Sequence, residues 1–207
     1  MSRLATLFLL GLAGISAAAC LNLGAKPDPT RFFVLTPLAR QERDTAGSGS
    51  HPDRVALGVG PITFPGYLDR DQLITRISEN RFAVAENNRW GEPLEQNFVR
   101  VLSQNLSLLL ASDKVARFPW PSTDRPAYQV EIDVLRFEAD TAGTARLVAR
   151  WVLREVATGQ TPGVRESRLD RPAGGRSADE SVATLSEVLA DFSSEIAAAV
   201  RAMAQRQ

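Results

Sequence analysis

The sequence has very few of the residues that commonly build catalytic or metal centres. Its 207 residues include one cysteine, Cys20, and one histidine, His51. A zinc site needs several imidazole or thiolate ligands, and a disulfide needs two cysteines. The histidine stands beside Pro52 in a polar segment, which is typical of a solvated surface residue. We therefore expect no metal, no cofactor and no intrachain disulfide.

An excess of charge of either sign is missing as well. Lys and Arg together number 24, as do Asp and Glu, and removal of the first 19 residues leaves a formal charge of −1. Proteins that bind nucleic acid neutralise phosphates with clustered basic side chains. The balanced composition therefore predicts no nucleic-acid partner.

Two short motifs superficially suggest catalysis. The run Gly47–His51 (GSGSH) lies in a segment of linker composition, whereas a nucleophile elbow requires Gly-x-Ser-x-Gly between a strand and a helix. The run Gly58–Pro61 (GVGP) lacks the third glycine and the following helix of a dinucleotide fingerprint. We expect that the protein is not an enzyme.

The amino-terminal segment carries a clear targeting pattern. Arg3 precedes an uncharged run from Leu4 to Ala19, which small residues close immediately before Cys20. About 16 apolar residues are short for a membrane-spanning helix, which needs roughly 20. The run Ala17–Cys20 (AAAC) resembles a lipobox, although Leu is the usual residue where Ala17 stands. This pattern predicts a lipoprotein signal cut before Cys20, whose sulfur carries diacylglycerol and whose new amino terminus is acylated.

The sequence accordingly divides into three parts. We expect a signal peptide over residues 1–19, the lipidated Cys20 with a tether over residues 20–30, and a single domain over residues 31–207. Leu21, in place of the Asp that retains many lipoproteins in the inner membrane, indicates the outer membrane, with the domain facing the periplasm. Inner-membrane anchoring stays open. So do a plain secreted protein cut after Ala19 and an uncleaved anchor.

The domain alternates between strand-like and helix-like segments. Strand patterns precede the first helix at 31–35, 55–64, 72–77 and 82–85, and follow it at 115–120, 128–134, 145–156 and 164–169. Asn87–Arg89 is predicted to be a turn. Few helices and short connections favour the α+β class, with a mainly antiparallel or mixed sheet and two long helices packed on one face.

Both helices show an apolar stripe. Pro93 indicates the start of the first, and Ser177 with Glu180 forms a capping box at the start of the second. We expect both stripes to pack on the sheet. The stripe residues are Leu94, Phe98, Val101, Leu102, Asn105, Leu106 and Leu109 in the first helix, and Val182, Leu185, Leu189, Phe192, Ile196, Val200 and Met203 in the second.

The loop from Tyr67 to Arg70 is the candidate partner-binding site. Tyr67 and Leu68 stand beside Asp69 and Arg70 at a strand junction, and Trp90 precedes the first helix. An aromatic and an aliphatic side chain bordered by charges are typical of a protein interface. The alternative is that Tyr67, Leu68 and Trp90 close the end of the core.

Two segments resemble a known family. The run Phe64–Arg76 (FPGYLDRDQLITR) is similar to the PGYLDRPQLVTR-type stretch of the PqiC family of ABC-transport auxiliary lipoproteins, with Asp71 where proline is usual. The run Arg89–Leu94 (RWGEPL) resembles the opening of that family's first helix. The run Phe32–Leu35 (FFVL) and the Cys20 signal occur in the matching order. The resemblance covers nearly the whole chain after Cys20.

The resemblance implies a function. Such lipoproteins accompany an MCE-domain protein and its membrane permease in lipid transport across the envelope, so it implies a docking component at the outer membrane. Two alternatives remain: an activator or assembly factor for cell-wall or outer-membrane biogenesis, and a direct lipid carrier, which would need an apolar cavity. The sequence also leaves a homo-oligomer open.

Overall fold

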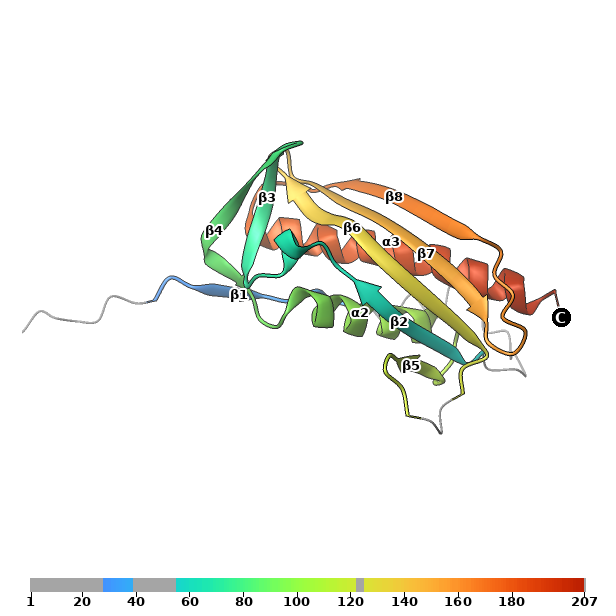
Figure 1. Cartoon of the computed structure of the whole chain (residues 1–207). Coiled ribbons are helices and arrows are strands. Elements are labelled where there is room, and N and C mark those ends of the chain that lie inside the picture. Colours follow the sequence, from blue (N-terminus) through green and yellow to red (C-terminus); the bar gives the residue numbers. More distant parts are fainter. Residues whose placement is uncertain (1–27, 39–54, 122–124, 207) are drawn as a thin grey trace, which may run out of the picture.

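The computed structural model describes residues 28–38, 55–121 and 125–206. Within these residues eight strands form one sheet, and two helices lie together on one of its faces (Figure 1). The helices are α2 (Leu94–Leu109) and α3 (Ala178–Ala204), and a 3-10 helix, η2 (Gly66–Leu68), follows β2. The strands are β1 (Arg31–Phe33), β2 (Leu57–Thr63), β3 (Gln72–Ser78), β4 (Arg81–Trp90), β5 (Val115–Arg117), β6 (Tyr128–Asp140), β7 (Thr144–Glu155) and β8 (Val164–Pro172).

The sheet is mixed and branches at β6. Its main order is β1-β4-β3-β6-β2-β5, and β7 pairs with β6 and with β8. The first half of β6 pairs in parallel with β2, its last two residues pair in parallel with β3, and β7 runs antiparallel along its length. The predicted α+β class, with a mixed sheet and two helices, is confirmed.

The predicted turn at Asn87–Arg89 is wrong. Strand β4 continues through these residues to Trp90, because β1 pairs with it in parallel, Arg31 opposite Asn88 and Phe32 opposite Arg89. Strand β1 provides hydrogen-bond partners for the β4 backbone at these residues, so the chain stays extended and does not turn. Strand β1 in turn ends at Phe33, before the predicted end at residue 35.

Two irregularities shape the long strands. In β2 the register shifts between Val59 and Ile62, where Gly60 has a φ of 111°, as the two glycines of this strand predicted. In β6 the register shifts between Val134 and Arg136. Because side chains alternate along a strand, the second shift changes which β6 residues face the helices.

The core lies between the sheet and the two helices. The Phe98 ring of α2 packs edge-on against Phe137 of β6, with 5.2 Å between centroids, and Trp151 of β7 meets Phe192 of α3 in the same way at 6.4 Å. Leu102 and Phe192 are fully buried, as the helical stripes predicted. The capping box is also confirmed, since the Glu180 N–H donates to Ser177 Oγ and the Ser177 N–H donates to Glu180 Oε2.

The chain segment after β1, residues 34–38, lies against both helices. The N–H of Leu35 donates to Asn97 Oδ1 of α2 at 3.2 Å, and the N–H of Leu38 donates to Asn105 Oδ1 at 2.8 Å. The N–H of Thr36 donates to Ser186 Oγ of α3 at 3.1 Å. We call residues 34–38 the strap. Polar side chains on the two helices thus accept hydrogen bonds from backbone N–H groups of the strap, which is not part of the sheet.

Candidate functional site

The predicted contact loop connects β2 to β3 and contains η2. Leu68 is 3% exposed and Trp90 is 7% exposed, and both pack in the core. The backbone N–H of Trp90 donates to the Asp71 carbonyl at 2.6 Å, which ties the loop to the end of β4. Asp69 is exposed and Arg70 is half-buried. Of the predicted set, Asp69 is the exposed residue, while Tyr67 and Arg70 are both half-buried.

Tyr67 belongs to a buried network around Glu138. Its hydroxyl donates to Glu138 Oε2 at 2.8 Å, and the side chain of Glu138 is 1% exposed. The Nε atoms of Arg76 and Arg136 donate to Glu138 Oε1 at 2.6 and 3.0 Å. Two guanidinium groups and a phenol therefore compensate the carboxylate for its lost hydration.

Burial also changes the acidity of the phenol. Removal from water and, after it, the negative charge of Glu138 disfavour the phenolate, and they raise the pKa of Tyr67 to about 12. Tyr67 is therefore a neutral hydrogen-bond donor at any physiological pH. Its role in this network is to position the loop, not to exchange protons.

Aromatic rings and arginines hold the loop on the β3–β4 hairpin. The Tyr67 ring stacks on Phe82 of β4 with 5.5 Å between centroids and 29° between planes. The Arg70 guanidinium lies 5.6 Å from the Phe82 ring, and its Nε donates to the Tyr67 carbonyl at 2.8 Å. The Arg76 guanidinium lies 5.5 Å from the Tyr67 ring. Cation–π contacts are stronger when they are partly removed from water. Together with the ring stacking and the hydrogen bond, they hold the loop in one position against the hairpin.

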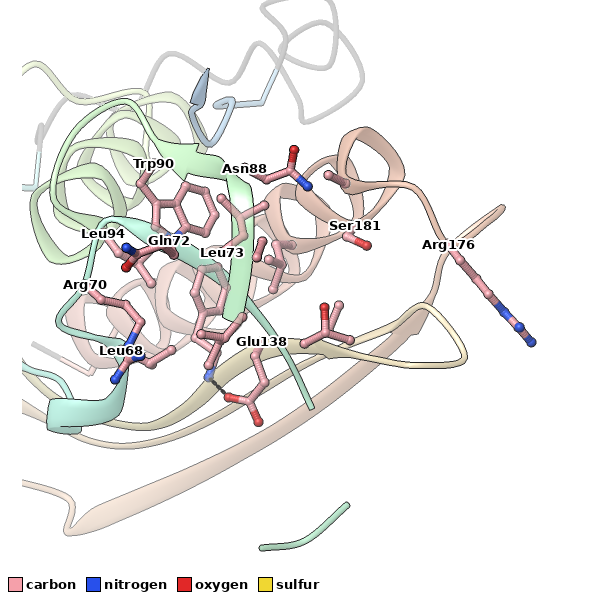
Figure 2. Close-up of a pocket in the computed structure, with 17 residues that line it drawn as sticks. Leu68, Arg70, Gln72, Leu73, Asn88, Trp90, Leu94, Glu138, Arg176 and Ser181 are labelled. Carbon is pink, nitrogen blue, oxygen red and sulfur yellow. Dashed lines mark hydrogen bonds between the residues drawn. The ribbon is translucent and has the colours of Figure 1, made fainter. Parts of the chain in front are cut away.

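A small cavity lies beneath the loop (Figure 2). It measures about 120 Å³ and lies between β3, β4, the end of β6 and the start of α3. Leu68, Leu73 and Trp90 supply apolar walls, and Glu138 lines it from β6. In Figure 2 Arg176 extends away from the other residues drawn. Ligand pockets for drug-sized molecules measure roughly 300–1,000 Å³, so this cavity is too small for an acyl chain of a phospholipid.

A larger hollow lies on the surface beside the loop. Its volume is about 650 Å³, and it is lined by the loop on one side and by the first turn of α2 on the other. Asp69, Arg70 and Asp71 border it from the loop, and Glu95 and Gln96 from the helix. We call this hollow the loop groove. It presents charged side chains of both signs, and a polar, charged rim is typical of protein interfaces.

The sequence did not reveal Glu138 and its two arginines as part of this site. Arg136 and Glu138 lie on β6 beyond the predicted end of its strand pattern at Val134, because the irregularity at Leu135 interrupts the alternation. Glu138 then lies on the face away from the helices. Cys20, the predicted lipidation site, lies outside the described residues, as does His51.

The described residues provide neither a metal-binding cluster nor a membrane-spanning helix. Over residues 28–38, 55–121 and 125–206, no group of three or more His, Cys, Asp and Glu side chains is placed to hold a metal ion. The helices in the same part of the chain are too short or too polar to cross a membrane.

The fold and site define an α+β domain whose charged groove lies at one end of the sheet. The sequence model of the ABC-type transport auxiliary lipoprotein component matches residues 33–197. The chain therefore belongs to this family of auxiliary lipoproteins of transport systems.

Individual relatives agree with this assignment. The chain is 26% identical over 150 residues to the intermembrane transport lipoprotein PqiC of Escherichia coli, and the aligned residues cover 72% of each of the two chains. It is equally similar to PqiC of Shigella flexneri. A crystal structure of an uncharacterised protein superposes with a TM-score of 0.66 at 25% identity, over 83% of this chain and 98% of that one. Protein XCC0632 of Xanthomonas campestris has the same fold, with a TM-score of 0.65 at 16% identity over 86% and 100% of the two chains.

Proposed function

We propose that this auxiliary lipoprotein is a non-enzymatic docking component of an MCE/ABC-type lipid-transport system. The observation that carries the proposal is the similarity to the intermembrane transport lipoprotein PqiC, together with the family match over residues 33–197. The partners would be an MCE-domain protein and its membrane permease. The domain would face the periplasm from the outer membrane.

The anchor in this proposal is Cys20, the single cysteine of the sequence. Its position after an apolar run that ends in three alanines supports lipidation by diacylglycerol and an amino-terminal acyl chain. Cys20→Ser should leave the precursor uncut and free of labelled palmitate. Normal processing and membrane retention of that variant would contradict the anchor. Separation of inner and outer membranes by density would test the location.

The docking surface in this proposal is the loop groove. Asp69 and Arg70 stand side by side at its border, and Arg70 is fixed by Phe82 and by the Tyr67 carbonyl. A charged group whose side chain is already ordered loses little conformational entropy when a partner binds it. Arginine held against an aromatic ring is also a frequent energetic centre of protein interfaces.

The test is co-purification of the MCE protein with the full-length lipoprotein from membranes. Asp69→Arg changes an exposed side chain and should leave folding intact, yet weaken binding roughly tenfold if the loop groove is the contact. Arg117→Glu, an exposed arginine on β5 outside the groove, is the matched control. Wild-type recovery of the partner with a folded Asp69→Arg/Arg70→Glu variant would place the contact elsewhere.

The two alternative functions make different predictions. A direct lipid carrier would need an enclosed apolar volume, and the cavity under the loop measures about 120 Å³. Mass spectrometry of lipids retained by the purified domain would test that role. An activator or assembly factor would instead co-purify with a peptidoglycan synthase or an outer-membrane assembly complex. Recovery of either without an MCE protein would contradict our proposal.

A further inference from the structure

Two exposed apolar side chains lie at the edge strand β1 and at the residue that follows it, close to where the amino-terminal tether enters the domain. Phe32 is 69% exposed and Val34 is 47% exposed, whereas their neighbours Phe33 and Leu35 pack against or within the core. Since successive side chains of an extended chain point in opposite directions, Phe32 and Val34 share the outward side. Gly91 of the connection to α2 lies beneath them, because a Cβ there would be 3.2 Å from Val34 Cγ1 and 4.0 Å from Phe32 Cβ. We call Phe32 and Val34 the edge patch.

The edge patch has a fixed orientation relative to the fold. Strand β1 pairs with β4 at three positions, and the N–H of Gly91 donates to the Phe33 carbonyl at 2.8 Å. The strap then continues from β1 with backbone hydrogen bonds to α2 and α3. Phe32 and Val34 therefore cannot turn inward without breaking these bonds, and their exposure is a property of the fold.

The edge patch is also close in the chain to the proposed anchor. Phe32 stands twelve positions after Cys20, and Asp28, where the described chain begins, stands eight positions after it. Eight extended residues span at most about 28 Å. With Cys20 in a bilayer, the chain length keeps the beginning of β1 within about 28 Å of the lipid surface.

We propose that the edge patch contacts the phospholipid bilayer to which Cys20 anchors the protein. This inference rests on the lipidation proposed above. Aromatic and aliphatic side chains lower their free energy when they enter the membrane interface, and aromatic residues are concentrated there. The contact would give a tethered domain a preferred orientation, with β1 toward the membrane.

The contact is apolar rather than electrostatic. The nearest basic side chain on the same strand, Arg31, is engaged by Asp179 at 3.2 Å and by Asn88 at 3.0 Å. Lys and Arg attract anionic lipid when they are clustered beside a membrane, and β1 contributes one such residue, already paired. The proposed contact should therefore form on zwitterionic phosphatidylcholine and should be insensitive to salt.

The test uses the full-length, lipidated protein in phosphatidylcholine vesicles. An environment-sensitive fluorophore is attached at Phe32→Cys, and in a second protein at Val164→Cys. Val164 is the matched control because it is 70% exposed and lies on β8, at another edge of the sheet (Figure 1). Brominated phospholipids quench a fluorophore that touches the acyl region. We expect a blue-shifted emission and strong quenching at position 32, and neither at position 164.

Each other outcome overturns the inference. Equal emission and quenching at the two positions, in protein whose mass shows acylated Cys20, would refute the contact and leave the anchor intact. Unacylated Cys20 would refute the anchor and the contact together. Shielding of position 32 that occurs only with the MCE protein, or in detergent as the lipoprotein concentration rises, would assign the edge patch to that partner or to a second copy.

Discussion

The hydroxyl of Tyr67 donates to the carboxylate of Glu138 across 2.8 Å, and this bond joins the loop after β2 to the far end of β6. The two residues are 71 positions apart in the sequence. Glu138 also accepts hydrogen bonds from Arg76 and Arg136. One buried carboxylate thus holds the loop, the β3–β4 hairpin and β6 together.

Removal of that carboxylate should be strongly destabilising. Glu138→Ala removes the negative charge that pairs with the guanidinium groups of Arg76 and Arg136. Loss of one partner of a buried ion pair costs about 3–5 kcal/mol. Urea unfolding monitored by circular dichroism would measure it. Glu166→Ala is the control, since its ion pairs with Arg150 and Arg168 lie at the surface, where water and salt screen them, and its effect should be much smaller. Similar losses in both variants would contradict the central role of Glu138.

The acidity of Tyr67 can be measured directly, because the sequence holds two tyrosines, Tyr67 and Tyr128. Absorbance of tyrosinate in Tyr128→Phe should show a single transition near the raised pKa of about 12. The stability that the neutral phenol contributes is complete below pH 10, the unfolded value, and is lost as the pH rises toward about 12. Tyr67→Phe should therefore lose stability less steeply than wild type between pH 10 and 12. A transition near pH 10 in the folded protein would exclude the buried hydrogen bond.

The strap should depend on its side-chain acceptors. Asn105→Ala leaves the Leu38 N–H without its acceptor and also removes the hydrogen bond from Asn105 Nδ2 to Ser193 Oγ. We expect a loss of about 1–3 kcal/mol and faster hydrogen exchange at Leu38. Ser194→Ala is the control, because its hydroxyl is exposed and donates to the Ala190 carbonyl of its own helix. Unchanged exchange at Leu38 in Asn105→Ala would contradict the proposed attachment.

The helical core gives a further test. Leu102→Ala and Phe192→Ala each remove a fully buried side chain between the helices and the sheet. Such truncations cost about 2–5 kcal/mol, because they leave a cavity as well as losing the transfer free energy. Thermal and chemical unfolding would measure the change. Losses below about 0.5 kcal/mol at both positions would mean that the helices do not pack as described.

Local patterns predicted the local structure well. The capping box at Ser177 and Glu180 forms within one helical turn, and the alternation of Arg146, Leu147 and Arg150 along β7 reflects that strand's own two faces. Both signals depend on neighbours in sequence, so the sequence contains all that is needed to read them.

The features that the sequence did not predict depend on distant segments. Asn88 looks like a turn residue until β1, 57 positions earlier, pairs beside it. Asn105 lies within the apolar stripe of α2, yet it is the acceptor for the strap. For Leu68 and Trp90 the sequence left an interface and the end of the core open, and the structure buries both side chains.

The attachment of β1 and the strap also has a mechanical consequence. The chain amino-terminal to Asp28 joins the fold through β1, which pairs in parallel with β4 along its three residues. A pull along β1 from that side acts across the hydrogen bonds, so they are loaded in shear and share the force instead of opening one after another. Further along the chain, in the strap, three backbone N–H groups donate hydrogen bonds to the side chains of Asn97, Ser186 and Asn105. Load on the amino-terminal segment is thereby shared between β4 and both helices instead of falling on β1 alone.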